Sequence, residues 1–268
     1  MIPSYPCKTA LSRSTLPGLQ YTFNPYVGCQ HGCLYCYVPD VLGRSLPKMT
    51  WGREVFVKEK VVELLRSEIK RKAPGVVGVS TATDPYQPVE RELELTRRAL
   101  IVLSESLFPI SIQTKSPMVL RDLDIIKGKK FDVGFTITSI DREFQRKFEP
   151  GAPPPEERIS ALETVSSYGI TTWIFYGPII PNYNDSPEVM EKIVLLAKKT
   201  GSRIIYDRLN LKPLVIQRLS RVFGSNEIPH KEPLATISAR LERLCRNYGV
   251  KCEFAFPQSL RKMPKKFM

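Results

Sequence analysis

The stretch Gly28-Cys29-Gln30-His31-Gly32-Cys33-Leu34-Tyr35-Cys36-Tyr37 places three cysteines within eight residues, at the spacing C-x3-C-x2-C. They are half of the six cysteines of the chain, and they follow an apolar run that predicts a first strand. Three thiolates on one short loop can bind three irons of a [4Fe–4S] cube, whereas four cysteines complete such a cluster. Catalytic metal sites keep one position open. The spacing therefore predicts a [4Fe–4S] cluster, held by Cys29, Cys33 and Cys36, whose fourth iron binds another molecule.

A structural zinc site is the alternative interpretation of the same loop. Such sites use four Cys or His ligands, commonly in paired C-x2-C units, so His31 would have to be the fourth ligand. His31 stands between the cysteines, where the loop is tightest, which favours the cluster. Gly28 and Gly32 also suit a cluster, because glycine lets the backbone turn sharply and approach a bulky cofactor.

The composition indicates a folded chain without a membrane span. With 268 residues, 42% of them hydrophobic, the chain can bury the core of one large domain or two small ones. No apolar run reaches the length of about 18 residues that a transmembrane helix needs. The first residues lack the charged and apolar regions of a signal peptide. The expected absence of a signal peptide and a membrane span, together with cysteines that stay reduced, predicts a cytoplasmic protein.

The formal net charge of +13 indicates a polyanionic partner, most economically a nucleic acid. Charge alone gives affinity for phosphates without sequence information, and a solvated basic surface is the alternative. The densest basic stretch is the tail, residues 261–266, which could follow a phosphate backbone or serve only solubility.

Apolar runs and helical periodicities alternate along the chain. We expect strands at 76–79, 109–114, 132–138, 171–176 and 202–206, in addition to the first strand, and helices at 54–72, 89–107, 118–127, 155–168 and 186–199. Six strands that each precede a helix predict a parallel α/β fold, either a partial (β/α)6 barrel or a doubly wound sheet. The cysteine loop after the first strand favours the barrel, because active sites there lie at the carboxyl ends of the strands.

The expected strands and helices divide the chain into three parts. They are a lead-in at 1–18, a core at 19–212, and a C-terminal extension at 213–268 that ends in the basic tail. The extension is expected to contain a helix at 231–248 and a strand at 250–256, either a seventh strand or a cap on the barrel.

Polar residues follow the expected strands, which suits a ligand with carboxylate, amine and ribose groups. The second strand ends in Ser80-Thr81-Ala82-Thr83-Asp84, the third in Thr114-Lys115-Ser116, and the fourth carries Thr136 and Thr138. Helix capping is the alternative role for any single hydroxyl here.

The cysteine motif resembles a known family. C-x3-C-x-aromatic-C, with Tyr35 as the aromatic residue, is similar to the signature of radical S-adenosylmethionine (radical SAM) enzymes. The strings Asn24-Pro25-Tyr26-Val27-Gly28-Cys29, Thr83-Asp84-Pro85-Tyr86-Gln87-Pro88 and Phe148-Glu149-Pro150-Gly151, the last followed by Arg158, resemble the branch of spore photoproduct lyase and DNA-repair-photolyase-like proteins. The resemblance implies a partial barrel over about 19–212. It also implies a cluster that binds S-adenosylmethionine (SAM) and, when reduced by a donor such as ferredoxin or flavodoxin, cleaves it to a 5′-deoxyadenosyl radical.

Carried over from the family, Thr83, Lys115 and Thr136 are the expected SAM-binding residues, beside the motif residue Tyr35, and Lys115 pairs with the SAM carboxylate. One departure concerns the hydrogen donor. The lyase has a hydrogen-donating cysteine in its second-strand segment, whereas Thr81 stands there in this chain. Lyase activity on spore photoproduct itself is therefore not expected, unless Cys245 or Cys252 supplies a thiol.

Three functions compete at this point. The first is a radical SAM enzyme that acts on a nucleic acid or another anionic substrate, with DNA repair as the model. The second keeps this chemistry but modifies a peptide or a small metabolite. The third is a non-catalytic iron–sulfur protein for electron transfer or structure. A steep fall of affinity with salt separates the first from the second, and SAM cleavage separates both from the third. Tyr35, Tyr37, Trp51 and Tyr86 are candidates for stacking on bases or, alternatively, for packing.

Overall fold

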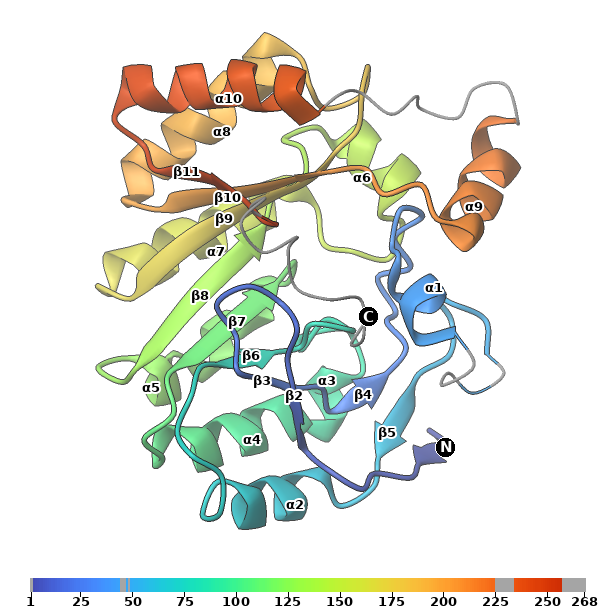
Figure 1. Ribbon diagram of the computed structural model, residues 1–268, viewed down its shortest axis with the longest axis vertical. Coiled ribbons are helices and arrows are strands. Elements are labelled where there is room, and N and C mark those ends of the chain that lie inside the picture. Colours follow the sequence, from blue (N-terminus) through green and yellow to red (C-terminus); the bar gives the residue numbers. More distant parts are fainter. Residues whose placement is uncertain (1, 44–46, 48, 225–233, 257–268) are drawn as a thin grey trace.

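The computed structural model describes residues 2–43, 47, 49–224 and 234–256. Its centre is an eight-stranded sheet in the order β11-β10-β9-β8-β7-β6-β3-β2, curved and covered by helices on its outer side (Figure 1). Every neighbouring pair is parallel except β2 with β3. The six parallel strands β3 and β6 to β10 confirm the predicted partial (β/α)6 barrel. The sheet is open: in the described part of the chain, no pairing joins β11 to β2.

The strands of the main sheet are β2 (Leu11–Arg13), β3 (Tyr21–Phe23), β6 (Val77–Val79), β7 (Ile110–Thr114), β8 (Phe131–Thr136), β9 (Thr171–Ile179), β10 (Arg203–Arg208) and β11 (Cys252–Phe254). A small sheet pairs β1 (Ser4–Tyr5), β5 (Phe56–Lys58) and β4 (Tyr26–Val27). The helices are α1 (Val38–Leu42), α2 (Val61–Glu68), α3 (Glu90–Leu93), α4 (Leu95–Ser104), α5 (Leu123–Ile126), α6 (Arg142–Phe148), α7 (Pro155–Ser167), α8 (Pro187–Thr200), α9 (Pro213–Phe223) and α10 (Leu234–Tyr248).

Strand β6 is apolar on both faces, as buried parallel strands require, whereas β7 and β8 also carry half-buried polar residues such as Gln113 and Asp132. All three residues of β6 are buried. In β8, Gly134 leaves room for the indole of Trp173 on β9, since a Cβ atom there would lie 2.2 Å from the ring. Asp132 fixes the same indole by accepting a hydrogen bond from its Nε1 at 2.7 Å.

Two expected helices are shorter than predicted. The helix expected at 54–72 is α2 alone, because Phe56–Lys58 forms strand β5 between β1 and β4. The helix expected at 89–107 is broken at Glu94, where φ is +49°. There the carboxylate of Glu90 accepts hydrogen bonds from the backbone N–H groups of Thr96 and Arg97 and so starts a new helix, α4.

Other boundaries shift modestly. The helix expected at 118–127 is a 3₁₀ helix, Pro117–Asp122, followed by α5, and β8 ends at Thr136 rather than 138. Helices α6 and α9 were not predicted. No helix in the described part of the chain is long and apolar enough to span a membrane.

The C-terminal part adds a seventh parallel strand, because β11 pairs with β10. Helix α10 covers this end of the sheet through Ile237, Leu241 and Cys245, which are buried in the main core. The basic tail, residues 261–266, and the start of the helix expected at 231–248 lie outside the described residues. The division at 212–213 stays a prediction.

Candidate cofactor site

The three motif cysteines lie on one loop, residues 28–37, which joins β4 to α1 and is called the cluster loop here. Cys29 and Cys33 are buried, Cys36 is half-buried, and none of the three is in a disulfide. Gly28, with φ +94°, starts the loop where a Cβ atom would lie 2.5 Å from the carbonyl oxygen of Glu54. Only glycine fits this turn against the neighbouring backbone.

The segment 83–89, at the carboxyl end of β6, holds the first half of the cluster loop. The side-chain oxygen of Gln87 accepts a hydrogen bond from Gln30 N at 2.8 Å, and its amide nitrogen donates to Thr83 Oγ1 at 2.8 Å. Thr83 in turn donates to the carbonyl oxygen of Gly28. In return, Gln30 accepts from the backbone N–H of Val89 at 2.8 Å. The loop and the segment therefore fix one another.

The segment Phe148–Gly151 holds the second half. Leu34 N donates to the carbonyl oxygen of Phe148 at 2.9 Å, and Gly151 N donates to that of His31 at 3.0 Å. A Cβ atom on Gly151 would lie 2.2 Å from the carbonyl oxygen of Gln30. This contact is backbone against backbone, so the close approach requires glycine.

A buried charge pair supports Tyr35. The Tyr35 hydroxyl donates to Glu149 Oε1, which also accepts from Thr138 Oγ1 at 2.8 Å. The other carboxylate oxygen, Oε2, pairs with the guanidinium of Arg158, and both side chains are 1% exposed. Burial would raise the pKa of Glu149, but Arg158, Lys115 and these hydrogen bonds outweigh it and lower the pKa to about 2. Glu149 and Arg158 are thus an ion pair beneath the motif aromatic.

Lys115 follows β7 and lies beside the same residues. Its Nζ is 5.7 Å from the centroid of the Tyr35 ring, within the range of a cation–π contact. Burial would lower the pKa of Lys115, but the negative charges of the Cys33 thiolate and the Glu149 carboxylate outweigh it and raise the pKa. Lys115 therefore places a positive charge close to the middle cysteine.

The four expected SAM residues are not equivalent in the structure. Lys115 is half-buried beside Tyr35, which is itself buried. Thr136, at the end of β8, is buried and accepts a hydrogen bond from Gln113 Nε2 at 3.2 Å. Thr83 makes the two bonds to the cluster loop and Gln87 that are given above. Their roles in SAM binding stay predictions.

His31, the possible fourth zinc ligand, is directed elsewhere. Its Nδ1 lies 3.4 Å from Asp84 Oδ2. Asp84 also accepts hydrogen bonds from Lys115 N at 2.8 Å and from Thr114 Oγ1 at 2.7 Å. Burial would raise the pKa of Asp84, yet His31 and these donors lower it to about 2. Asp84 therefore links the cluster loop to the end of β7.

The three motif thiols could hold a cluster if bound metal stabilised their thiolate forms. Burial raises the pKa of Cys33 to about 12, and it also raises the pKa of Cys29 and Cys36. Bound metal would supply the positive charge that buried thiolates need. No three Cys, His, Asp or Glu side chains of the described residues converge on one ion. A cube does not require this, because each thiolate binds a different iron.

Helix α9, which the sequence did not predict, packs on the cluster loop. Arg218 of α9 donates through Nε to the carbonyl oxygen of Leu34 at 3.0 Å and through Nη2 to that of Cys36. The backbone N–H of Leu214 bonds Asp40 Oδ1 of α1 at 2.8 Å. The apolar spacing of Val215, Leu219 and Phe223 was the available signal for this helix.

Two expectations about other residues change. Tyr86 is 1% exposed and its hydroxyl donates to the buried Asp122 at 2.9 Å, so it packs in the core and cannot stack on a base. Cys245 and Cys252 are joined in a disulfide between α10 and β11, with their Cα atoms 6.2 Å apart. Neither is a free thiol in this structure.

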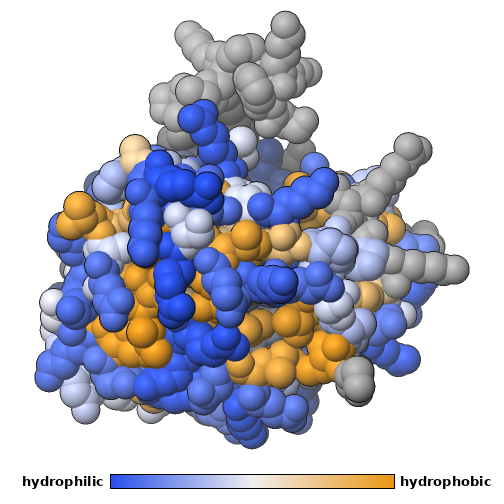
Figure 2. All heavy atoms as spheres, turned by 90° about the horizontal axis from the view of Figure 1, so that it is seen from below, coloured by the Kyte–Doolittle hydropathy of each residue, from blue (hydrophilic) through white to orange (hydrophobic). Residues whose placement is uncertain are grey.

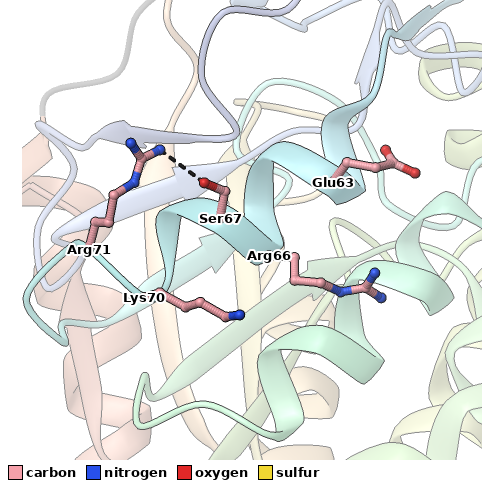
Figure 3. A pocket seen from close by; sticks show the side chains of 5 residues that line it. All are labelled: Glu63, Arg66, Ser67, Lys70 and Arg71. Carbon is pink, nitrogen blue, oxygen red and sulfur yellow. Dashed lines mark hydrogen bonds between the residues drawn. The ribbon is translucent and has the colours of Figure 1, made fainter.

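A hollow on the outer surface lies away from the cluster loop. Five residues of α2 and the turn after it line this hollow: Glu63, Arg66, Ser67, Lys70 and Arg71 (Figure 3). The only interaction drawn among them is the 3.1 Å hydrogen bond from Arg71 to Ser67. It is a basic surface feature, separate from the cofactor site.

Comparison with known proteins identifies the family. The model of the radical SAM superfamily matches residues 23–194, and the chain belongs to this superfamily. An uncharacterized protein of Methanocaldococcus jannaschii, MJ0683, is 34% identical over 206 residues, which are 76% of each chain.

Solved structures share the fold. Spore photoproduct lyase, as a mutant with bound SAM and dinucleoside spore photoproduct, has a TM-score of 0.70 at 15% identity, over 92% of this chain and 78% of the lyase. SuiB of Streptococcus suis, bound to SAM, has a TM-score of 0.63 at 13% identity, over 91% of this chain and 52% of SuiB.

Proposed function

We propose that this protein is an enzyme that binds a [4Fe–4S] cluster through Cys29, Cys33 and Cys36 and cleaves SAM reductively to act on a nucleic acid. The observation that carries the proposal is the arrangement of three unpaired cysteines on a loop that segments 83–89 and 148–151 hold by direct hydrogen bonds. The superfamily membership and the SAM-bound structural neighbours support it.

The bound cluster would supply an open iron for SAM and the electron that breaks its carbon–sulfur bond. The chain would contribute the rest of the site. The Lys115 ammonium, half-buried beside Tyr35, suits the SAM carboxylate. Thr136 and Thr83 offer hydroxyl groups at the ends of β8 and β6 for the remaining polar groups of SAM. The Glu149–Arg158 pair would keep Tyr35, and with it the cluster loop, in place.

A nucleic acid is the proposed substrate class for two reasons. The chain carries a formal net charge of +13, and a basic surface attracts the phosphate backbone. The structurally similar spore photoproduct lyase binds a dinucleoside photoproduct. This chain has Thr81 where the lyase resemblance places the hydrogen donor, and Cys245 and Cys252 are paired with each other. The proposed reaction therefore does not use a cysteine of these positions as hydrogen donor.

Anaerobic reconstitution tests the proposal. Protein loaded with iron and sulfide should contain about four irons per chain and, once reduced, should release 5′-deoxyadenosine from SAM, faster with the correct nucleic acid than without it. Replacing Cys29, Cys33 or Cys36 by Ala should remove the charge-transfer absorption, whereas replacing the half-buried Cys7 should not. Full iron content in all three variants, or zinc in anaerobically purified protein, would refute the assignment.

A further inference from the structure

Exposed cations gather on two turns at the amino ends of strands of the main sheet. The first turn, residues 69–76, precedes β6, and the second, residues 127–130, precedes β8. The exposed cations of these turns are Lys70, Arg71, Lys127, Lys129 and Lys130. These amino ends lie on the left of Figure 1, whereas α1 and α9, which contact the cluster loop, lie on its right. We call these five cations and the nearby Tyr168 the amino-end rim.

The two turns are held close together by the strand between them. Val77, the first residue of β6, donates its backbone N–H to Pro109 O at 2.9 Å, and Ile110, the first residue of β7, donates to Lys130 O at 2.8 Å. Neighbouring strands are spaced about 4.8 Å apart, so β6 and β8 begin about 10 Å apart. The cations of both turns therefore lie within reach of one extended ligand.

Most cations of the amino-end rim have no acidic partner. In the part of the chain that the structure describes, no ion pair involves four of them: Lys70, Arg71, Lys129 and Lys130. Elsewhere, the exposed Lys199 is paired with Glu163 at 2.7 Å. Glu63, which lies near the rim on α2, is already paired with Arg98 at 3.5 Å. The rim therefore keeps most of its positive charge available for an anion from outside the chain.

The hollow on α2 belongs to the same surface. Arg66 and Lys70 lie four residues apart and extend toward the same side of this segment (Figure 3), and like charges at this spacing are unfavourable. Both residues also line a second hollow of about 420 Å³, whose wall includes Glu105 and Leu107 from the turn before β7. An anion bound between Arg66 and Lys70 would relieve their repulsion.

Tyr168 adds an exposed aromatic ring to the rim. It lies in the turn between α7 and β9 and is 48% exposed, and Lys127 Nζ is 5.0 Å from the centroid of its ring. Proteins bind single-stranded nucleic acids with this combination, because cations contact the phosphates and bases stack on aromatic rings. Seen from below, the apolar groups over α2 and α4 are separated by hydrophilic side chains (Figure 2). This surface therefore lacks the continuous apolar centre of a protein–protein interface.

We propose that the amino-end rim binds a single-stranded nucleic acid, with its cations on phosphates and a base stacked on Tyr168. The inference rests on the nucleic-acid substrate of the proposed function, and it adds a surface at the end of the sheet away from the cluster loop. Strand β8 has six residues, a length of about 20 Å. A strand of about ten nucleotides, at about 3.4 Å each, is long enough to reach from the rim to the cluster loop.

The test measures the binding of a labelled oligo(dT) of about 25 nucleotides to the cluster-loaded full chain, by fluorescence anisotropy at several salt concentrations. The double variant Lys129→Glu/Lys130→Glu should bind about tenfold more weakly at about 0.1 M salt. Its salt slope should be shallower by about 1.4, because two phosphate contacts of about 0.7 each are lost. Tyr168→Ala should also bind about tenfold more weakly, but with the parental salt slope, because a stacked base releases no counterion.

Arg243 and Arg246 provide the matched control. Both are exposed on α10, which contacts β11 at the edge of the sheet, and neither forms an ion pair with another described residue. The double variant Arg243→Glu/Arg246→Glu changes the net charge as much as Lys129→Glu/Lys130→Glu does. It should bind the oligonucleotide with the affinity and the salt slope of the parent.

Each other outcome has a definite meaning. Parental affinity and salt slope in Lys129→Glu/Lys130→Glu would overturn the inference. Equal weakening in the α10 control would overturn it too, because net charge and not the rim would then set the affinity. Parental affinity in Tyr168→Ala would overturn the stacked base and with it the single strand. Binding of polyglutamate but of no nucleic acid would make the rim a protein-docking surface and overturn it. A parent chain that binds neither DNA nor RNA would instead refute the substrate class of the proposed function.

Discussion

Lys115 is the residue on which recognition of the SAM carboxylate would depend. Its ammonium lies beside the Tyr35 ring and next to the motif cysteines, but none of the hydrogen bonds that hold the cluster loop involves its side chain. Lys115→Ala should therefore leave the iron content unchanged and weaken SAM binding about 10- to 100-fold, as expected for a lost charge-assisted contact of about 1.5–3 kcal/mol. Binding is measured by equilibrium dialysis on the oxidised, loaded protein.

The exposed Lys129 provides the control, because Lys129→Ala should bind SAM as the parent does. Unchanged SAM affinity in Lys115→Ala would remove this residue from the site. Loss of iron from the same variant would show that Lys115 serves the cluster loop instead.

Glu149 should contribute more to stability than any exposed carboxylate. Glu149→Gln keeps an acceptor for Tyr35 but leaves the guanidinium of Arg158 buried without a counter-charge. Loss of one partner of a buried pair costs about 3–5 kcal/mol. Urea unfolding of the cluster-free protein should show a loss of this size at pH 7, whereas Glu156→Gln, in an exposed pair with Arg142, should show no measurable change.

The pH dependence of the free energy of unfolding shows whether ionised Glu149 stabilises or destabilises the fold. Its folded-state pKa is lowered from 4.5 to about 2, so ionised Glu149 stabilises the fold above the unfolded pKa. This stability is lost as the pH falls from about 4.5 through about 2, and the shift corresponds to about 3 kcal/mol. In Glu149→Gln, this part of the acid dependence should be missing. An acid unfolding curve identical to that of the parent would contradict the assignment.

At the scale of residues, the sequence predicted which residues form the site, but it did not predict which residues they contact. The cysteine spacing identified Cys29, Cys33 and Cys36 because it is a local pattern. That Thr83 bonds the Gly28 carbonyl, or that His31 faces Asp84, depends on how β6 and β7 lie beside the loop. Such contacts join residues more than 50 positions apart and leave no periodic signal.

The segment Phe148–Gly151 shows how one element can fix another. Gly151→Ala should displace the cluster loop, because the new Cβ atom would lie 2.2 Å from the carbonyl oxygen of Gln30 and neither backbone can yield freely. Overpacking of this kind costs about 1–3 kcal/mol. The expected result is a loss of that size in urea unfolding together with incomplete iron uptake on reconstitution.

A second glycine separates the two effects. Gly201, at the end of α8, has φ +64° and open space around its Cα, so Gly201→Ala should lose about 1 kcal/mol through backbone strain alone. Its iron uptake should equal that of the parent. Equal iron uptake in Gly151→Ala and Gly201→Ala would mean that the 148–151 segment does not position the cluster loop.

At the scale of elements, the parallel strands of the main sheet were predicted, but the short strands β1, β2 and β5 were missed, and helices were predicted less well. Strand β6 is buried on both faces and so forms a continuous apolar run, whereas β7 alternates buried residues with half-buried Ser111 and Gln113. Phe56–Lys58 fell within the helix expected at 54–72, whose periodic residues begin only at Val61, but it pairs with β1 and β4, and this pairing cannot be read from the local sequence. Helix α9 was missed although Val215 and Leu219 lie four residues apart, as on one face of a helix. The sequence alone does not show which element this face packs against.

At the scale of the whole molecule, the alternation of strands and helices was enough to predict a partial barrel. It was not enough to exclude a doubly wound sheet, since both folds alternate strands and helices. The difference lies in the strand order, which here runs from β3 through β6 to β10 without a reversal. The extra strand β11 was expected as a strand or a cap, and its pairing with β10 decides for the strand.

The net charge of +13, which is a property of the whole chain, predicts how nucleic-acid affinity should depend on salt. If the substrate is a nucleic acid, the affinity should fall steeply with salt, because each neutralised phosphate releases a counterion. For about five phosphates on duplex DNA, affinity should drop between about 100- and 1,000-fold from about 50 to about 200 mM salt. Fluorescence anisotropy of a labelled oligonucleotide measures the slope. A neutral peptide or metabolite substrate would show almost no slope, and a flat profile for DNA and RNA alike would exclude nucleic acid as the substrate class.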